Sequence, residues 1–269
     1  MRYWKNTNTL DAHVSALEHL ASPGEAEIAV IGSKAIDLDQ FPRLKGVFKC
    51  GIGTDNVPFE ECKARDIAVG LPGTATAEVI YEETANFAVY LILAMLYARA
   101  GSLDGWAKHP RPFLGRRNVL VIGTGNIGRR VHEKLTPLTN VLTFDIATHP
   151  ESDLEALVRQ AEVVSLHIPL TDETRNWFNR EKLGWMADEA ILVNTARAAI
   201  VPESDLHAEI QSGRIRAAFD VFWREPYEGE LRRFHPDRFL MTPHIASTCE
   251  DFLSGLARDL RAFEQTLGS

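Results

Sequence analysis

Arg197, Glu225 and His244 are three side chains that can act together on a small anionic molecule. Each of them follows a short apolar segment that is predicted to be a strand. A guanidinium binds a carboxylate or a carbonyl through forked hydrogen bonds, and an imidazole beside a carboxylate is suited to acid–base catalysis. These groups are what the oxidation of a hydroxyl next to a carboxylate requires, provided that a hydride acceptor binds nearby.

The binding site for such an acceptor is predicted from a glycine-rich segment. The segment follows the apolar run 119–122 and precedes a helical pattern, and it consists of Gly123, Thr124, Gly125, Asn126, Ile127 and Gly128. Its glycines permit a tight turn, the approach of a pyrophosphate to the backbone and close packing of the helix on the strand. The start of the helix adds free N–H groups that bind phosphates.

Asp145 ends the next predicted strand, where a carboxylate can accept hydrogen bonds from the adenosine ribose. It would repel a 2′-phosphate, and no arginine occurs in 146–148, so NAD is favoured over NADP. Two other interpretations stay open. In one, the glycines only form a tight turn and Asp145 caps a loop. In the other, the loop binds S-adenosylmethionine in a methyltransferase, which would leave the three downstream residues unexplained.

The composition is that of a soluble globular protein of one or two domains, with 269 residues, 45% apolar and 25% charged. The net charge is −8 and no basic run occurs, which disfavours nucleic-acid and membrane partners. Cys50, Cys62 and Cys249 match neither a disulfide framework nor a metal site, so no metal is expected. The first residues lack the apolar core of a signal peptide, and a cytoplasmic location is expected.

Strand-like and helix-like segments alternate, which predicts an α/β fold with parallel sheets. A helix is expected at Thr9–Ala21. The apolar run Ala85–Ala98 is shorter than the roughly 20 residues that cross a bilayer, so it is expected to be a helix buried on all sides. Turn residues follow it. The predicted domains are therefore 1–98, completed by a terminal helix at 248–269, and a dinucleotide-binding domain at 99–247.

The chain resembles the NAD-dependent family of D-isomer-specific 2-hydroxyacid dehydrogenases over nearly its whole length. The resemblance is carried by ordered segments, which are VLVIGTGNIGRR, VVSLHIPLTDETRN, AILVNTARAAIV, GRIRAAFDVFWREP and MTPHIAS. It implies two Rossmann-like or flavodoxin-like lobes with the active site in the cleft between the domains. It also implies hydride transfer between NAD(H) and C2 of a small 2-hydroxy or 2-keto acid.

The resemblance also assigns roles to individual residues. Arg197 would hold the substrate, His244 would be the general acid–base, and Glu225 would hydrogen-bond His244. Further cofactor contacts are implied at His167, Pro169, Thr174, Thr195, Ala196, Asp220 and His244, in addition to the glycine loop and Asp145. Substrate contacts are implied at Gly51, Ile52, Gly53, Arg197 and His244. Taken singly, His167 is as well explained by a structural role, and a cap of the preceding strand is the alternative role for Asp220.

For Trp223 and Arg224 the sequence offers two interpretations, which are a contact of one of them with the substrate, or a packing tryptophan and a solvated arginine. A phosphite dehydrogenase and a non-enzymatic NAD-responsive corepressor are alternatives on the same scaffold, whereas Glu225 disfavours formate oxidation. A homodimer is expected from the resemblance, but the short stretch between Arg99 and Arg117 weakens this. The N-terminal part leaves little room for a first strand.

Overall fold

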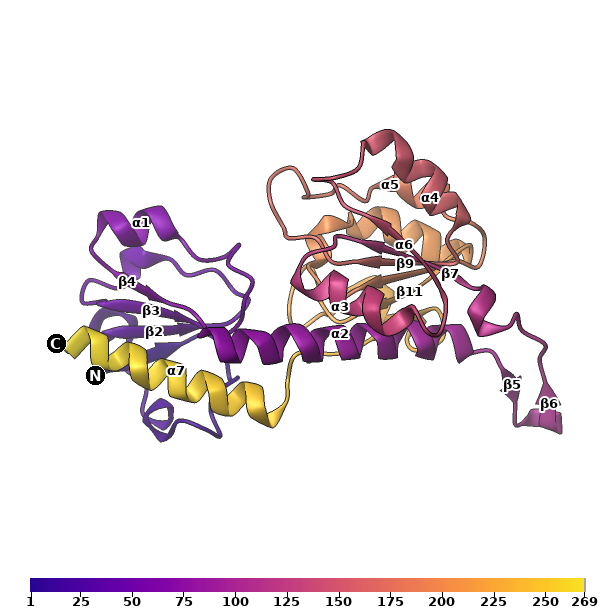
Figure 1. Ribbon diagram of the computed structural model, residues 1–269. Coiled ribbons are helices and arrows are strands. Elements are labelled where there is room, and N and C mark those ends of the chain that lie inside the picture. Colours follow the sequence, from indigo (N-terminus) through magenta and orange to yellow (C-terminus); the bar gives the residue numbers. More distant parts are fainter. Residues whose placement is uncertain (269) are drawn as a thin grey trace. The chain divides into compact units, whose positions relative to one another are not determined.

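The computed structural model describes residues 1–268, which form two compact units. Unit 1 consists of Met1–Ile80 together with the C-terminal segment from Ser247, and unit 2 consists of Tyr81–Ala246. The division falls within one helix, α2 (Thr74–Tyr97), which is labelled in Figure 1. Each unit contains its own parallel sheet, so the predicted α/β class is confirmed.

Unit 2 is built on a six-stranded sheet in the order β12-β11-β10-β9-β7-β8, and every neighbouring pair is parallel. The strands are β7 (Asn118–Ile122), β8 (Asn140–Phe144), β9 (Val163–Leu166), β10 (Ile191–Asn194), β11 (Arg216–Phe219) and β12 (Phe239–Met241). Most of their side chains are buried because helices cover both faces of the sheet, which explains why they are apolar runs.

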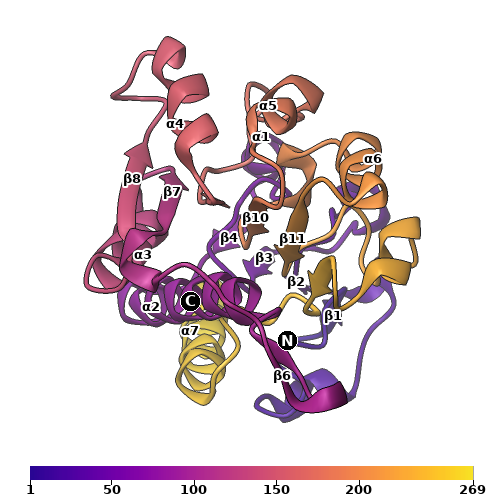
Figure 2. The same ribbon diagram turned by 90° about the vertical axis from the view of Figure 1, so that its right-hand side faces the viewer.

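The two faces of this sheet pack against different helices (Figure 2). Val119 and Val193 point to the face covered by α3 (Asn126–Leu135) and by the part of α2 that belongs to unit 2. Leu120 and Leu192 point to the opposite face, which is covered by α4 (Leu154–Gln160), α5 (Arg180–Trp185) and α6 (Glu203–Ser212). Alternate residues of each strand therefore contribute to two separate cores.

Unit 1 contains a four-stranded parallel sheet in the order β1-β2-β3-β4. Its strands are β1 (Tyr3–Lys5), β2 (Ile28–Ile31), β3 (Gly46–Lys49) and β4 (Ala68–Gly70). The helix α7 (Glu250–Gly268) covers one face and α1 (Phe59–Ala64) the other (Figure 1). The C-terminal segment is thus part of the core of unit 1.

Two expectations for the N-terminal part were wrong. A first strand does exist, since Tyr3–Lys5 pairs in parallel with β2. The helix expected at Thr9–Ala21 is instead a series of turns with one 3-10 helix, Ser15–Glu18. Val14 has an extended backbone, with φ −135° and ψ 97°, which interrupts a helix. The helical spacing of Leu10, Val14 and Leu17 reflects their common burial, which the turns achieve without a helix.

The α2 helix has 24 residues and is longer than predicted. Among the described residues, it is the one helix whose length and composition would allow it to span a membrane. It was expected to be buried on all sides, which was wrong. Ala88 and Leu91 are buried against the sheet of unit 2, whereas Tyr90 is 53% exposed. This one-sided burial is the packing of a core helix, and it explains why the unit division lies well before the predicted boundary at residue 98.

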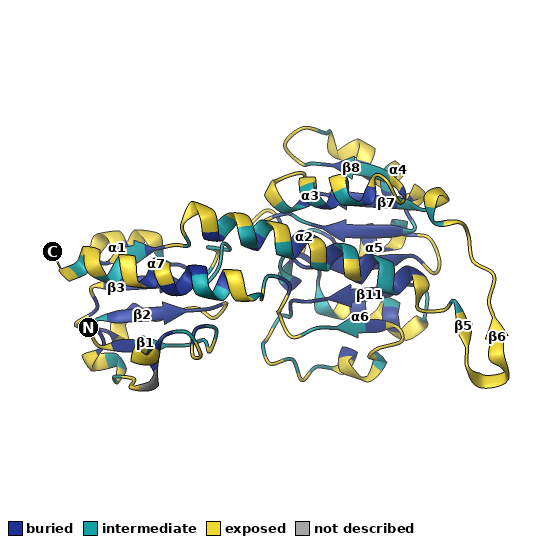
Figure 3. Cartoon of the chain, turned by 60° about the horizontal axis from the view of Figure 1, so that its bottom comes forward, coloured by how far each residue is buried: buried dark blue, intermediate teal, exposed yellow. Residues whose placement is uncertain are grey.

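A short hairpin leaves unit 2 between α2 and β7. It pairs β5 (Gly101–Ser102) with β6 (Ala107–Lys108) in an antiparallel manner, and its residues are exposed (Figure 3). Leu103 and Trp106 are 85% and 76% exposed. The sequence predicted only a break here, because Asp104 and Gly105 are turn residues. Gly105, with φ 68°, provides the left-handed turn of the hairpin.

The packing of unit 2 predicts the effect of truncating a core leucine. Leu192 is fully buried, so Leu192→Ala should lower the free energy of unfolding by about 2–5 kcal/mol through lost burial and a residual cavity. Urea unfolding followed by circular dichroism measures this change. Leu20→Ala is the matched control, because Leu20 is 47% exposed and should change stability by less than about 0.5 kcal/mol. Equal effects of the two variants would contradict the assigned core.

Candidate active site

The predicted cofactor and catalytic residues of unit 2 follow the carboxyl ends of its strands. The glycine loop follows β7, Asp145 follows β8 and His167 follows β9. Arg197, Glu225 and His244 come after β10, β11 and β12, which are neighbours in the sheet. The strand order reverses at β7, which pairs with both β8 and β9, and ligands of open parallel sheets bind at such a reversal.

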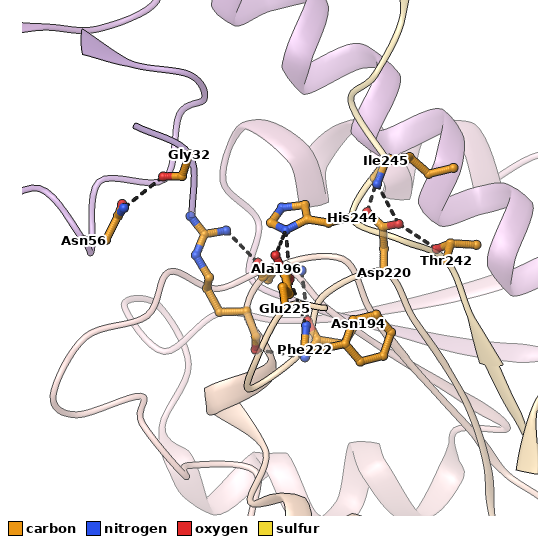
Figure 4. Close-up of polar contacts among 12 residues, drawn as sticks. Gly32, Asn56, Asn194, Ala196, Asp220, Phe222, Glu225, Thr242, His244 and Ile245 are labelled. Atoms are coloured by element: carbon orange, nitrogen blue, oxygen red, sulfur yellow. Dashed lines mark hydrogen bonds and ion pairs between the residues drawn. The ribbon is translucent and has the colours of Figure 1, made fainter. Parts of the chain in front are cut away.

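His244 and Glu225 form a direct pair (Figure 4). The Nδ1 atom of His244 lies 2.9 Å and 3.0 Å from the two carboxylate oxygens of Glu225, to which it donates. The backbone N–H of Phe222 also donates to Glu225 Oε1, at 3.2 Å. The carboxylate is therefore oriented by its own loop. Because Nδ1 is engaged, the other ring nitrogen of His244 is the one available for proton exchange with a substrate.

The backbone around His244 is held by a buried carboxylate, Asp220. Its Oδ1 accepts from the hydroxyl of Thr242 at 2.6 Å and from the N–H of Ile245 at 3.0 Å (Figure 4). Its Oδ2 accepts from the N–H of Ala246 at 2.8 Å. His244 itself has a left-handed backbone, with φ 54°, which is unfavourable for a side chain that is not glycine. These three hydrogen bonds compensate for that conformation.

Asp220 is fully buried. Burial raises the pKa of this carboxyl, while the hydrogen bonds from Thr242, Ile245 and Ala246 and the nearby His244 oppose the rise. The expected contact of Asp220 with the nicotinamide end of the cofactor stays a prediction. The structure adds a role that the sequence analysis missed, namely that Asp220 anchors the segment that carries His244.

The turn that carries Arg197 is held by another buried residue, Asn194, at the end of β10. Its Oδ1 accepts from the N–H of Ala196 and its Nδ2 donates to the carbonyl of Arg197, both at 2.9 Å. The Nη1 atom of Arg197 donates to the Ala196 carbonyl at 2.8 Å. The hydroxyl of Thr195 is buried and makes no hydrogen bond within the part of the chain that the structure describes. A polar atom of this kind is suited to a bound ligand.

The geometry of the glycine loop fits a dinucleotide. Gly123 has φ 93°, a conformation that favours glycine. A Cβ on Gly128 would lie 1.8 Å from the Gly123 carbonyl oxygen, so only glycine fits there. A Cβ on Gly125 would meet no atom within 4 Å, which leaves the loop open above the start of α3 at Asn126. The backbone conformation of Gly123 and the space around Gly125 and Gly128 are thus compatible with the roles predicted for the three glycines.

Asp145 is bound to this loop. The backbone N–H and the hydroxyl of Thr124 both donate to Asp145 Oδ2 at 2.7 Å, and the N–H of Ala147 donates to Oδ1 at 3.0 Å. The hydrogen bond from the Thr124 backbone is the largest of several effects that lower the pKa of Asp145. Asp145 is therefore ionised at neutral pH, as required of an acceptor for ribose hydroxyls.

The other predicted cofactor residues border the same strand ends. His167 Nε2 lies 2.8 Å from the hydroxyl of Ser165, and burial lowers the pKa of His167 to about 4, so its ring is neutral. The hydroxyl of Thr174 donates to the carbonyl of Pro169 at 2.7 Å and accepts from the N–H of Thr171, also at 2.7 Å. Thr174 thus shapes its loop, and a direct contact of these residues with the cofactor stays a prediction.

The predicted substrate residues Gly51, Ile52 and Gly53 follow β3 in unit 1, and their role stays a prediction. Gly51 has φ 141°, which favours glycine. Trp223 is a packing residue, because its indole N–H donates to the Val201 carbonyl at 2.8 Å and its ring lies against Phe219. Over residues 1–268, no cluster of three or more His, Cys, Asp or Glu side chains is arranged to hold a metal ion.

Comparison with known proteins identifies the family. Residues 95–246 match the family model described as D-isomer specific 2-hydroxyacid dehydrogenase, NAD binding domain. The chain belongs to this family. A hydroxypyruvate reductase from Thermotoga maritima is 34% identical over 223 residues, which is 77% of this chain and 72% of that protein. A glyoxylate reductase from Thermococcus kodakarensis is 33% identical over 264 residues, which is 86% of this chain and 78% of that protein.

A solved structure supports the same conclusion. The D-lactate dehydrogenase from Aquifex aeolicus, in complex with NAD and lactic acid, has a TM-score of 0.73 and 25% identity, covering 91% of this chain and 84% of that one. The chain is therefore an oxidoreductase that uses NAD(H) and acts on the 2-hydroxy acid and 2-keto acid pair. Phosphite oxidation and a purely NAD-sensing role are not favoured by these relatives.

The anchoring of the His244 segment gives a prediction. Thr242→Val removes the hydroxyl that donates to the buried Asp220 carboxylate, so it should lower the free energy of unfolding by about 1–3 kcal/mol. It should also lower kcat several-fold, because His244 is held less firmly. Thr242→Ser keeps the donor and should retain most of both properties. Chemical unfolding and steady-state kinetics measure the effects, and a valine variant as stable and active as wild type would refute the anchoring role.

Proposed function

We propose that this dehydrogenase interconverts small 2-keto acids, such as glyoxylate and hydroxypyruvate, with the corresponding 2-hydroxy acids, and that Arg197, Glu225 and His244 carry the reaction. The observation that supports the catalytic assignment is the His244–Glu225 pair, with separations of 2.9 Å and 3.0 Å at a strand end of the NAD-binding unit. The substrate class follows from relatives that are named glyoxylate and hydroxypyruvate reductases.

The His244–Glu225 pair would transfer the proton of the substrate hydroxyl. When bound, NAD(H) accepts or supplies the hydride at C2 of the substrate. His244 takes the hydroxyl proton on oxidation and returns it to the carbonyl oxygen on reduction, through the nitrogen that Glu225 does not occupy. Glu225 fixes the ring orientation through its contacts with Nδ1. The hydrogen bonds that Asp220 accepts from Thr242, Ile245 and Ala246 hold the segment that carries His244 in place in both directions of the reaction.

Arg197 accounts for the binding of the acid. Its planar guanidinium matches a carboxylate or carbonyl in a forked contact, which fixes the reacting carbon. Asn194 holds the backbone on both sides of Ala196 by hydrogen bonds of 2.9 Å, so the turn that presents Arg197 is rigid. A substrate that is placed by such a turn reacts faster, because the cost of orientation is met on binding.

For the cofactor, we propose contacts at each strand end of unit 2. The glycine loop and the start of α3 would bind the pyrophosphate, and Asp145 would bind the adenosine ribose. His167, Pro169 and Thr174 would line the adenosine side. Thr195, Ala196 and Asp220 would lie toward the nicotinamide, where the buried Thr195 hydroxyl would gain a partner.

We also propose that the protein is a cytoplasmic homodimer. The hairpin at 101–108 exposes Leu103 and Trp106, and Phe113 nearby is 74% exposed. Exposed apolar groups of this size are typical of contact surfaces.

The catalytic assignment is tested by kinetics. The wild-type protein should oxidise NADH in the presence of glyoxylate or hydroxypyruvate, and His244→Ala should lower kcat by about 10²–10⁴-fold through loss of proton transfer. His19→Ala is the control, because His19 is an exposed residue of unit 1 and should have no effect. Absorbance at the NADH band gives the rate. Binding of NADH without turnover of any 2-keto acid in the panel would reject the proposal.

The dimer is tested by light scattering after size exclusion. The wild-type protein should have about twice the chain mass of 30.0 kDa, and Trp106→Glu should shift it toward a single chain by placing a charge in the contact. Phe59→Glu is the matched control, because Phe59 is 42% exposed but lies outside the hairpin. A wild-type mass of one chain at micromolar concentration would exclude the dimer.

A further inference from the structure

The side chain of Thr124 makes a contact that no motif of the glycine loop requires. Thr124 lies between Gly123 and Gly125 and is exposed, yet its hydroxyl and its backbone N–H both donate to the same oxygen, Asp145 Oδ2, each at 2.7 Å. The glycines alone explain the shape of the loop. The hydroxyl of Thr124 is therefore an additional connection between the phosphate-binding loop and the ribose-binding carboxylate.

This contact determines which hydrogen bonds the site offers. A carboxylate has about four lone-pair positions. Two at Oδ2 are taken by Thr124 and one at Oδ1 is taken by the N–H of Ala147, so Asp145 is fixed with acceptor capacity on Oδ1. The hydroxyl proton of Thr124 is committed to Asp145, so toward a ligand its oxygen can only accept. Both side chains then present acceptors to whatever binds at the adenosine ribose.

The acceptor oxygens of Thr124 and Asp145 distinguish NAD from NADP. The ribose 2′-hydroxyl of NAD can donate to it, whereas the 2′-phosphate of NADP is an anionic acceptor and finds no donor on either side chain. The next three residues, Ile146, Ala147 and Thr148, carry no positive charge that would attract a phosphate. The preference for NAD therefore depends on the orientation of Asp145 as well as on its charge.

We propose that Thr124 is a specificity-determining residue, because its hydroxyl holds Asp145 in the orientation that accepts from the ribose of NAD and keeps both side chains acceptors toward the 2′ position. The assignment rests on the proposed contact of Asp145 with the adenosine ribose and concerns dinucleotide binding alone. It can be tested without any keto acid, so its outcome is independent of the substrate class.

The test is a comparison of NADH and NADPH affinities at pH 8, measured by quenching of protein fluorescence and by calorimetry. Thr124→Val keeps the shape of the side chain but removes the hydroxyl. Without the hydroxyl, the Asp145 carboxylate keeps only the backbone N–H of residue 124 at Oδ2 and is held less firmly in the orientation that accepts from the ribose, so Thr124→Val should raise the Kd for NADH roughly ten-fold and leave the Kd for NADPH nearly unchanged. Thr124→Ser keeps the hydroxyl and should retain the wild-type ratio of the two constants.

Two controls separate this role from a general effect on the loop. Thr148→Val also removes a threonine hydroxyl near Asp145, but that hydroxyl contacts His149 Nδ1 at 3.0 Å and not the carboxylate, so the ratio should not change. In an Asp145→Ala background, Thr124→Val should have no further effect on the ratio, because the hydroxyl acts through the carboxylate. Thr124→Ala repeats the test if the valine variant does not fold.

The outcomes are decisive in either direction. A fall in the ratio of NADPH to NADH dissociation constants in Thr124→Val, absent in Thr124→Ser and in the Asp145→Ala background, supports the assignment. An unchanged ratio, whether both affinities stay the same or fall together, would overturn it.

Discussion

The candidate active site of this protein depends on the hydrogen bonds that a buried carboxylate accepts from an irregular segment. Asp220 accepts from one hydroxyl and two backbone N–H groups of residues 242–246, and without them the left-handed conformation of His244 has no compensation. The geometry of the His244–Glu225 pair follows from this arrangement. The position of the His244 imidazole thus depends on Asp220, which directly follows the neighbouring strand β11.

Two other polar side chains along this edge of the sheet also bind the backbone of a neighbouring loop. Asn194 binds the backbone on both sides of Ala196, and Asp145 binds the backbone of Thr124 and Ala147. In each case an oxygen-bearing side chain at the last residue of a strand, or directly after it, satisfies the N–H groups of an adjacent loop. Loops at strand ends leave such groups without ladder partners, so a polar residue where an apolar strand ends shapes the loop.

Much of the fold and of the candidate site could be predicted from the sequence because the relevant signals are local. The strands of unit 2 are apolar runs, the glycine loop has its own spacing, and Arg197 and His244 each follow such a run closely. The first strand, Tyr3–Lys5, was missed because it is short and its assignment rests on pairing with β2, which is distant in sequence. The roles of Asn194 and Thr242 depend on tertiary contacts, which spacing does not reveal.

Cys50 directly follows β3 and precedes Gly51, Ile52 and Gly53, which are predicted to meet the substrate. Burial raises the pKa of its thiol to about 12, so the thiolate is scarce at any pH found in a cell. Peroxides and alkylating reagents attack the thiolate, and a cysteine in this state resists both. An enzyme that transfers hydride between small molecules thereby keeps the sulfur of Cys50 chemically inert, and purification in air should not alter this segment.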